Sequence, residues 1–456
     1  MSSAPLLWTQ DLDAPLAWRQ AQPISRRQFL ADARALAHRL PERGAMLNLT
    51  ADRYRFTVGL GAALLRGQYN LLPPNHTPDT IARLQQAYPG IYGLTDQDGM
   101  DTPIALIRHA GEPADTAAQP GVPMLDEQML AAQVLTSGST GAPQPHAKQW
   151  GLLVRNTRMG AQRLAQQMGL PSLAGVTLVA TVPAQHMYGF ESSVLVCLLG
   201  GAAFNTDRPF YPADIAAALQ QAPRPRMLVT APFHLKALLD SGVALPGIDL
   251  ILCATAPLAP QLAARAEAAL AAPLMEIYGC TEAGQVATRR TTAGAEWRTY
   301  DGLSLSGDGA QTVVQGGHVP QPTTLADVLE VTGTQTFRLL GRSNDLINVA
   351  GKRSSLAHLN FHLNSLPGVN DGAFWMPPGD APSGVVRMIA FVVAPDLPAG
   401  TLHEHVMAGL RVRVDPAFLP RRVIAVPALP RAPGTGKLPL SSFEPWARAT
   451  MARARG

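Results

Sequence analysis

Residues 248–272, IDLILCATAPLAPQLAARAEAALAA, hold the pattern that decides the fold class. The part that starts at Ile248 is a short apolar run of strand length, and the part that starts at Pro260 is rich in Ala and Leu with helical periodicity. Further segments of both kinds are VTLVATVP from Val176 and RQFLADARALAHRL at 27–40. This alternation predicts an α/β domain with layered, mostly parallel sheets.

The segments that follow predict a small β subdomain and then a domain boundary. Residues 297–324 are rich in Gly and β-forming residues, and residues 325–345 have the pattern of a β-hairpin that leads into a polar connector. We therefore expect a large N-terminal domain at 1–341, a hinge at 342–345 and a smaller α+β domain at 346–456. The last segment has the size of a single domain.

Composition bounds the class of protein. Of the 456 residues, 46% are hydrophobic and 15% charged, which is typical of a folded, soluble protein with a large core. The three cysteines are far apart, so neither a disulfide framework nor a CxxC metal site is indicated, and we expect a cytoplasmic location. The longest apolar stretch, Val194 to Phe204, is about half of the ~20 residues that span a bilayer, and no signal peptide is evident. Export and membrane insertion are not expected.

The C-terminal segment is more basic than the rest of the chain. Residues 346–456 carry twelve Lys and Arg against six Asp and Glu, a net charge of +6 in a chain whose overall charge is +4. This surplus fits either a solvated face or a docking surface for an acidic partner or for phosphates. Nucleic acid is not indicated, because the basic residues are not interleaved with aromatic ones.

The stretch LTSGSTGAPQPHAK, residues 135–148, has the composition of a phosphate-binding loop. Its two glycines and four hydroxyl residues offer backbone N–H groups and side-chain donors to an anion. The lysine that usually follows such a loop is absent, because Gln144 and Pro145 come first and Lys148 lies three residues further on. The stretch is not a Walker A motif, and a polar turn closed by Pro143 is the alternative.

The segment IYGCTEAG, residues 277–284, places an aromatic ring, a glycine, a hydroxyl and a carboxylate within five positions. Tyr278 could stack on a purine, Thr281 could donate to a phosphate, and Glu282 could hold Mg²⁺, which prefers oxygen ligands that it shares with phosphates. A turn at the end of a strand would explain the same residues without a ligand.

In their order along the chain, five motifs resemble those of the ANL superfamily of AMP-forming enzymes: acyl- and aryl-CoA ligases, adenylation domains that load carrier proteins, and luciferases. The motifs are TSGSTGAP at 136, PAQHMYG at 183, IYGCTE at 277, Asp327 fifteen residues before Arg342, and GTGK ending at Lys437. The resemblance covers nearly the whole chain. It implies ATP, Mg²⁺, a carboxylic acid and a phosphopantetheine thiol as the reacting components, and a mobile C-terminal domain.

The resemblance also implies which residues bind ATP. The β- and γ-phosphates would lie in the loop formed by Thr136, Ser137, Gly138, Ser139, Thr140 and Gly141. Tyr278 and Gly279 would lie at the adenine, Thr281 near the α-phosphate, and Glu282 on the magnesium ion. Asp327 would bind the ribose hydroxyls and Arg342 the ribose and phosphate, although an exposed hairpin acid is the alternative for Asp327.

The catalytic residues that the resemblance implies are Lys437, His186 and Thr281. Lys437 would reach the substrate carboxylate and the α-phosphate while negative charge grows on the phosphate oxygens. An ordinary solvated lysine is the alternative. His186 matches the histidine at the mouth of the carboxylate pocket, although a lone histidine is also common in a core or on a surface.

For the second step the small domain would rotate at Asn344 and bring the face around Gly351 to a tunnel for the pantetheine thiol. Asn344 and Asn348 stand where charged residues are more usual in this superfamily. These departures leave a hinge plausible and the individual roles open.

The acyl pocket of such enzymes lies between the segment around His186, the run from Val229 and the turn at 277–284. Candidate lining residues are His186, Met187, Tyr188, Phe190, Glu191, Phe233, Ala254 and Val286. Aromatic and apolar walls suit an aryl acid or a medium-chain acyl acid. Each of these residues could instead belong to the core.

The loop variant and the short chain resemble compact ligases of aryl-polyene and xanthomonadin-type pigment synthesis. These are similar to enzymes that activate a hydroxybenzoate-like acid and load it onto an acyl carrier protein. The basic C-terminal segment agrees with an acidic carrier protein as partner. The alternatives are an acyl-CoA synthetase that uses free CoA with a fatty acid or another aryl acid, a non-catalytic adenylate-binding relative, and a luciferase-type monooxygenase.

Overall fold

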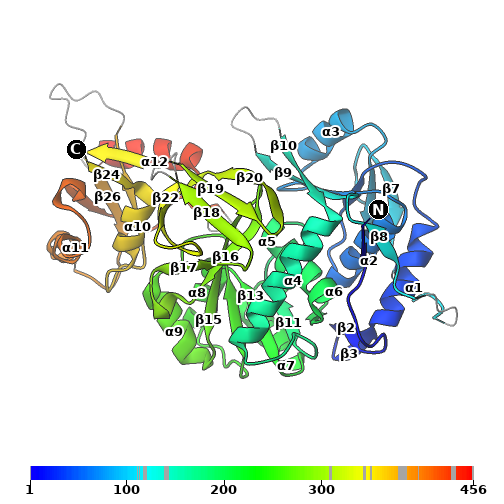
Figure 1. Cartoon of the computed structure of the whole chain (residues 1–456). Helices are drawn as coiled ribbons and strands as arrows, with labels where there is room; N and C mark the ends of the chain where they lie inside the picture. The colour runs from blue at the N-terminus through cyan, green and yellow to red at the C-terminus, as the bar shows by residue number, and fades with distance from the viewer. Residues whose placement is uncertain are drawn as a thin grey trace.

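The computed structural model describes residues 2–109, 111, 113–116, 121–137, 143–307, 311–342, 346–349, 352–377, 388–398, 400–432 and 438–453. In Figure 1 the residues up to 342 form the larger part, and the orange and red elements that follow gather beside it at one end. Hydrophobic clusters follow the same division, since two of them contain only residues after 346. The exact domain boundary and the hinge remain predictions.

A six-stranded sheet forms the first layer. Its order is β10-β9-β5-β4-β6-β7, in which β10 is antiparallel to β9 and all other neighbours are parallel. The strands are β4 (Met46–Asn48), β5 (Asn70–Leu72), β6 (Tyr92–Thr95), β7 (Ala105–Arg108), β9 (Leu130–Ser137) and β10 (Pro143–Gln149). Beside this sheet a two-stranded sheet pairs β1 (Ser3–Pro5) with β8 (Met124–Asp126).

An eleven-stranded sheet forms the second layer, in the order β21-β22-β17-β16-β15-β14-β13-β11-β12-β2-β3. Its strands are β2 (Pro15–Arg19), β3 (Gln22–Ser25), β11 (Thr177–Ala180), β12 (Ala203–Asn205), β13 (Arg226–Thr230), β14 (Leu250–Cys253), β15 (Leu274–Cys280), β16 (Gly284–Arg289), β17 (Glu296–Thr299), β21 (Asp327–Val331) and β22 (Thr336–Arg342). The run from β2 to β15 is parallel, and the pairs at both ends are antiparallel. The expected α/β class is confirmed, and the sheet is mixed because hairpins extend a parallel centre.

Helices pack around these sheets in the larger part. They are α1 (Arg26–Ala37), α2 (Arg53–Leu65), α3 (Pro78–Ala87), α4 (Trp150–Gln167), α5 (Met187–Gly189), α6 (Val196–Gly200), α7 (Pro212–Gln221), α8 (Pro232–Asp240) and α9 (Pro260–Leu270), with a π-helix η1 (Phe190–Leu195) and a 3₁₀ turn η2 (Thr291–Ala293). Local sequence explains several starts. Ser25, Asp52 and Thr77 cap α1, α2 and α3 with side-chain oxygens, and α3, α7, α8 and α9 begin with proline, whose fixed φ suits the first turn.

The expected small β subdomain is a three-stranded antiparallel sheet of β18 (Leu303–Gly307), β19 (Thr312–Gly316) and β20 (Val319–Leu325). Trp297, which we placed in this subdomain, lies instead on β17 of the large sheet. The expected hairpin at 325–345 is confirmed as β21 and β22.

The described residues of the C-terminal part form small sheets and helices. The hairpin of β23 (Leu346–Val349) and β24 (Lys352–Ser355) is followed by a sheet of β25 (Asp371–Trp375), β26 (Ile389–Val393) and β27 (Arg422–Ala425). Its helices are α10 (Leu356–Asn364), α11 (Leu402–Arg411) and α12 (Leu440–Arg453), with a 3₁₀ turn η4 (Pro416–Phe418). The side-chain amide of Gln261 on α9 donates to the Ser365 carbonyl just after α10, so the two parts of the chain touch here.

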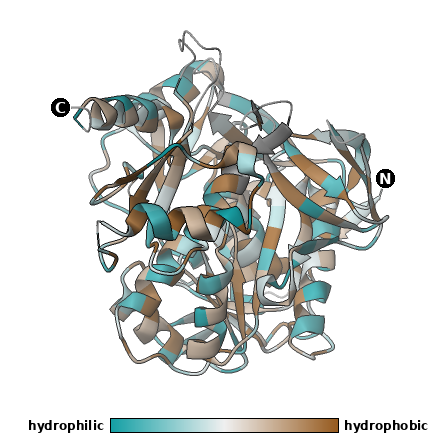
Figure 2. Ribbon diagram, turned by 90° about the vertical axis from the view of Figure 1, so that its left-hand side faces the viewer, coloured by the Kyte–Doolittle hydropathy of each residue, from teal (hydrophilic) through white to brown (hydrophobic). Residues whose placement is uncertain are grey.

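The apolar residues lie inside the layers. Figure 2 shows brown, apolar residues concentrated on the central strands, while the outer helices carry both polar and apolar faces. The apolar stretch from Val194 to Phe204 is buried, as expected, and forms the end of η1, α6 and β12. Within the described ranges no helix has both the length and the hydropathy of a membrane span.

Candidate active site

The predicted pocket segments converge at one edge of the large sheet. β11, β13, β14 and β15 are adjacent and parallel, so their carboxyl ends lie side by side. His186 follows β11, Phe233 follows β13, Ala254 follows β14, and the turn at 281–283 follows β15. The carboxyl edge of parallel strands is the usual place for a ligand in an α/β sheet.

Two residues that the sequence assigns to adenosine are in direct contact. The hydroxyl of Tyr278, near the end of β15, donates to Oδ2 of Asp327 at 2.9 Å. The Tyr278 ring packs edge-on against Trp297 and Phe337, with centroid distances of 5.9 and 5.4 Å. These contacts fix the orientation of the ring and of the carboxylate together.

Asp327 and Arg342 are directly opposite each other in the antiparallel register of β21 and β22. The fifteen-residue spacing therefore corresponds to a hairpin whose first and last residues pair. The side chain of Arg342 lies outside the described residues, so its contact with a nucleotide remains a prediction.

The segment 277–284 forms a tight hairpin between β15 and β16, with Thr281, Glu282 and Ala283 in the turn. Gly284 has a φ of +77°, and a Cβ there would lie 2.6 Å from Nδ2 of Asn156 and 3.0 Å from Oε1 of Glu191. Only glycine meets both requirements without displacement of a buried neighbour. The turn is thus packed closely against α4 and η1.

The lysine that follows the loop late in the sequence is buried. Lys148, on β10, is 8% exposed, and its Nζ donates to the backbone carbonyl of Thr281 and, at 3.4 Å, to that of Glu282. Burial lowers the pKa of this ammonium group, and the carboxylate of Glu191 opposes that shift. The side chain therefore binds the β15–β16 turn.

Glu191 lies in a buried polar network beside this turn. Nδ2 of Asn156 donates to its Oε1 at 2.9 Å, and Nε2 of Gln285 donates to the neighbouring Ser192 hydroxyl at 3.0 Å. Burial raises the pKa of the Glu191 carboxyl from 4.5 to about 7, and the nearby Lys148 charge opposes that shift. Glu191 was predicted to line the substrate pocket, and here its carboxylate is engaged by protein groups.

A hydroxyl–imidazole pair joins the two strands that precede and follow the glycine-rich loop in the sequence. Oγ1 of Thr136 on β9 lies 3.1 Å from Nε2 of His146 on β10. Burial lowers the pKa of His146, and the Glu282 carboxylate is close enough to raise it. The β9–β10 hairpin and the exposed residue Glu282 are neighbours, because Lys148 of β10 donates to the Glu282 backbone carbonyl. A magnesium ion that accompanies ATP needs only one or two protein carboxylates, so the Glu282 side chain fits that ion.

His186 begins α5, and its Nε2 lies 3.2 Å from the Pro74 carbonyl. His76 is nearby, and burial together with His186 lowers the pKa of His76 to about 4. The π-helix η1 follows directly, and such helices are frequent at functional sites. His186 therefore lies between the two layers, at the carboxyl edge of the large sheet.

The candidate lining residues have different environments. Met187 and Phe233 are partly exposed, Ala254 is 8% exposed, and the Tyr188 hydroxyl donates to the Leu252 carbonyl at 3.0 Å. Phe190 and Val286 are 0% exposed and pack in hydrophobic clusters. These two side chains fill the core beneath the site, because no surface of theirs is open to a ligand in this structure.

Several predicted residues lie outside the described part of the chain: Gly138, Ser139, Thr140, Gly141, Asn344, Gly351 and Lys437. The same holds for the side chain of Ser137. Their roles remain predictions from the sequence. Gly279 is described and lies opposite Gln285, where the pairing skips Val286 of β16.

Sequence reasoning missed Asn156, Gln285 and His318, which lie beside the turn, and His146, which contacts Thr136. His318, in the β19–β20 turn, is 5% exposed beside the backbone of Ala283, and burial lowers its pKa to about 4. The only sequence signal was a set of polar residues inside apolar segments, such as Asn156 within α4. Their partners are distant in sequence, so the pattern alone does not reveal them.

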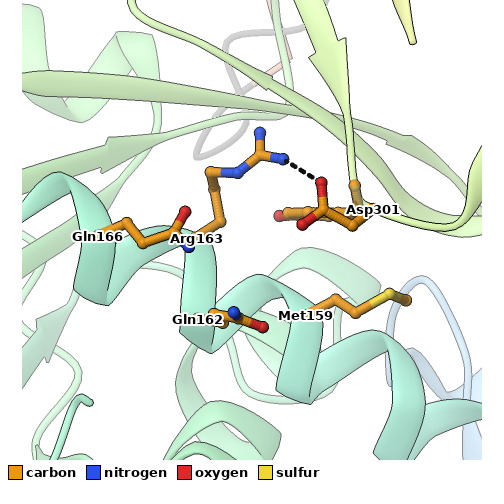
Figure 3. A pocket seen from close by; sticks show the side chains of 6 residues that line it. Met159, Gln162, Arg163, Gln166 and Asp301 are labelled. Atoms are coloured by element: carbon orange, nitrogen blue, oxygen red, sulfur yellow. Dashed lines mark ion pairs between the residues drawn. The ribbon is translucent and has the colours of Figure 1, made fainter. Parts of the chain in front are cut away.

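A shallow recess beyond this network belongs to a different region. Figure 3 shows its lining on α4 and the start of the β17–β18 connection: Met159, Gln162, Arg163, Gln166, Tyr300 and Asp301. Arg163 pairs with Asp301 at 3.6 Å and donates to Thr288 and Thr299 at 3.0 Å each. The recess holds about one water molecule, which is too small for an acid substrate.

Known proteins resemble this chain in sequence and in fold. A 4-coumarate–CoA ligase of Rhodobacter capsulatus is 34% identical over 281 residues, which is 61% of this chain and 66% of that protein. The chain thus spans slightly less than two thirds of that relative.

Two solved structures share the fold over nearly the whole length. An anthranilate CoA ligase in complex with anthranoyl-AMP has a TM-score of 0.80 at 15% identity and covers 99% of both chains. An o-succinylbenzoate CoA synthetase from Bacillus subtilis, in complex with its acyl-adenylate, has a TM-score of 0.76 at 17% identity and covers 96% of this chain and 97% of its own. At these identities the likeness shows the fold.

The family assignment rests on a wider match. The family model described as AMP-binding enzyme matches residues 30–323, which is more than half of the chain. The matched range contains the β9–β10 hairpin, the His186 segment and the β15–β16 turn. The chain therefore belongs to the AMP-binding enzyme family.

Proposed function

We propose that this protein is an AMP-forming acid–thiol ligase. It would activate a carboxylic acid with ATP, release pyrophosphate and then transfer the acyl group to a phosphopantetheine thiol. The observation that carries the proposal is the convergence of the Tyr278–Asp327 pair, at 2.9 Å, with the turn that holds Thr281 and Glu282. A purine nucleoside at the pair would place its phosphates at the turn and at the loop that follows Thr136.

In the first step an oxygen of the substrate carboxylate attacks the α-phosphorus of ATP, and the bond to the β-phosphate oxygen breaks. Pyrophosphate leaves, and the mixed anhydride of the acid and AMP remains. Thr281 would donate to the α-phosphate, and Lys437 would offset the charge that grows on the transferring group. Glu282 would hold the magnesium ion, whose charge neutralises the departing phosphates.

In the second step the thiol sulfur of phosphopantetheine attacks the acyl carbon, and AMP leaves with the electron pair of the anhydride bond. His186 would close the carboxylate end of the pocket. Rotation of the C-terminal part about Asn344 would remove Lys437 and bring Gly351 to the thiol tunnel. The resemblance to the ANL superfamily supports the role of His186 and the rotation of the C-terminal part.

We infer an aryl acid as substrate, and a hydroxybenzoate-like acid as the first candidate. The support comes from two partly exposed aromatic residues, Tyr188 and Phe233, which follow the adjacent strands β11 and β13, and from the named relatives, which are ligases of aryl acids. An apolar wall with few polar groups suits an aromatic ring better than a short charged acid.

We infer that the acceptor of the acyl group is the phosphopantetheine thiol of an acyl carrier protein. The C-terminal part carries an exposed basic segment at Arg411 and Arg413, on either side of Val412, which is 79% exposed. Arg421 is exposed as well. A basic surface with an apolar centre is complementary to an acidic carrier protein, and charge complementarity accelerates encounter. A cytoplasmic location agrees with this partner.

Free CoA is the second candidate acceptor, because the curated relative is named as a CoA ligase. The test compares acyl transfer to a holo carrier protein with transfer to CoA, using hydroxybenzoates, benzoates, cinnamates and fatty acids of C6 to C16 length. Preference for the carrier protein with a hydroxybenzoate supports the full proposal. Strong preference for CoA would refute the inference of a carrier protein as partner. Strong preference for long fatty acids would refute the inference of an aryl acid as substrate.

A further inference from the structure

The ammonium group of Lys148 links the two main sheets. Lys148 lies on β10 of the six-stranded sheet, and the two carbonyls that it binds belong to the turn between β15 and β16 of the eleven-stranded sheet. An ammonium ion is expensive to bury unless its hydrogen bonds are replaced. Both of its observed acceptors are backbone oxygens of neighbouring residues, Thr281 and Glu282.

The β15–β16 hairpin whose turn Lys148 binds has further buried polar contacts. Asn156 and Glu191 pack against Gly284, where a Cβ would come within 2.6 and 3.0 Å of their side-chain atoms. Gln285, the next residue, donates to Ser192 at 3.0 Å and accepts from the Tyr300 hydroxyl at 3.1 Å. Lys148 and these buried polar side chains therefore all contact the β15–β16 turn or the residues that directly follow it.

β10 is also the second strand of the β9–β10 hairpin, whose strands precede and follow residues 138–142 in the sequence. Gln144 on β10 is opposite Thr136 on β9, and Lys148 is opposite Ala132 in the same register. Any movement of the hairpin relative to the large sheet would change the distance between Lys148 and the turn. The Thr136–His146 pair, at 3.1 Å, lies on the same hairpin and would move with it.

We propose that Lys148 is a positioning residue that keeps the Thr281–Glu282 turn aligned with the β9–β10 hairpin, so that groups from both sheets face one MgATP. This inference rests on the proposed function. It differs from the role of a lysine within the loop, because the Lys148 ammonium is buried and binds the turn. Gln144 is exposed and leaves the loop without a lysine at the usual position.

The proposal predicts a difference between two nucleotides. AMP needs the Tyr278–Asp327 pair and, for its one phosphate, Thr281, whereas MgATP also needs Glu282 for its magnesium ion and the β9–β10 hairpin in register with the turn. Loss of the Lys148 ammonium should therefore weaken MgATP binding more than AMP binding. A general loss of structure would weaken both.

The experiment measures binding of MgATP and of AMP by calorimetry for the wild type, Lys148→Met, Lys148→Arg and the control Lys236→Met. Lys236 is a partly exposed lysine paired with Asp240 on α8. We expect Lys148→Met to weaken MgATP binding by about 10- to 100-fold, as outer-shell substitutions at metal sites do. AMP binding should weaken clearly less than MgATP binding, because only Thr281 of the turn would contact its phosphate, and Lys236→Met should behave as wild type.

Lys148→Arg keeps the charge and guards against a Met variant that fails to fold. Since the charge is kept, the Lys148→Arg variant should fold. Because the guanidinium is longer and planar, it should not reproduce the lysine's contacts with the turn, and MgATP binding should weaken more than AMP binding. Adding Gln144→Lys to Lys148→Met should restore MgATP binding at most in part, by the about 1.4- to 5-fold gain expected of an exposed charge, because a charge at position 144 does not hold the turn. Equal effects on MgATP and AMP, no effect on either, or full rescue by Gln144→Lys would overturn the inference.

Pyrophosphate exchange by the wild type is measured in parallel. A wild type that binds MgATP without acid-dependent exchange would refute the proposed reaction, and the binding comparison would still decide the role of Lys148. A wild type that binds neither nucleotide would overturn both the proposed reaction and the proposed role of Lys148.

Discussion

The hydroxyl of Tyr278 and the carboxylate of Asp327 are joined by a 2.9 Å hydrogen bond across 49 residues of sequence. The bond connects the end of a parallel strand, β15, with the first residue of an edge hairpin, β21. It couples the orientation of an aromatic ring to that of the acid that the resemblance assigns to the ribose.

Tyr278→Phe removes this hydrogen bond and keeps the ring. We expect AMP binding to weaken roughly fivefold, because a hydrogen bond worth about 1 kcal/mol no longer orients the Asp327 carboxylate. Calorimetric titration with AMP measures the effect, and Tyr211→Phe, at an exposed tyrosine, is the control. Unchanged AMP affinity would show that the bond has no part in nucleotide binding.

Lys437→Ala should abolish formation of the acyl-adenylate while the protein stays folded. Loss of one preorganised cationic donor at a transition state costs about 10² to 10³ in rate. The measurement is pyrophosphate release with a saturating acid, and circular dichroism checks the fold. Lys236→Ala serves as the control, and a Lys437→Ala variant with the wild-type rate would refute the assigned role.

Glu191 predicts a specific pH dependence of stability. Its carboxyl pKa is raised from 4.5 to about 7 by burial, so the folded protein binds this proton more tightly than the unfolded chain does. The free energy of unfolding should therefore fall as pH rises from about 4.5 to about 7, by at most ~3 kcal/mol from this group.

Glu191→Gln removes the titration and can still accept the hydrogen bond from Asn156. The difference in urea midpoint between Glu191→Gln and the wild type isolates this group from the buried histidines, which titrate in the same range. The variant should gain stability relative to the wild type as pH rises from 5 to about 7.5. A constant difference across this range would mean that the carboxyl titrates normally.

Gln144→Lys tests the vacant lysine position of the loop. Gln144 is exposed and opposite Thr136, so a lysine there would face solvent and the phosphates. An exposed charge interaction contributes about 0.2 to 1 kcal/mol, so we expect the Kd for MgATP to fall about 1.4- to 5-fold at low salt. The gain should shrink at high salt, and no change at low salt would show that the position is idle.

The sequence predicted the fold class because strand length and helical periodicity are local properties. The segments around Val176 and Ile248 became β11 and β14, and the segment from Pro260 became α9. The hairpin that pairs Asp327 with Arg342 was also predictable, since its turn and its alternating residues are contiguous.

The environment of the site was less predictable. Lys148 looks like a surface lysine in the sequence, and its burial depends on carbonyls 133 and 134 residues away. Phe190 and Val286 are of the same residue types as pocket walls, yet both are fully buried. Apolar residues do not reveal from sequence whether they face a ligand or the core, because both environments favour them.

Acid-dependent exchange of labelled pyrophosphate into ATP tests the central claim most directly. With MgATP and a panel of aryl acids, we expect exchange that requires the acid, is greatest with a hydroxybenzoate-like acid and is lost in Lys437→Ala. Absence of exchange with every acid, while MgATP still binds, would contradict the account and would identify the protein as a non-catalytic nucleotide-binding relative.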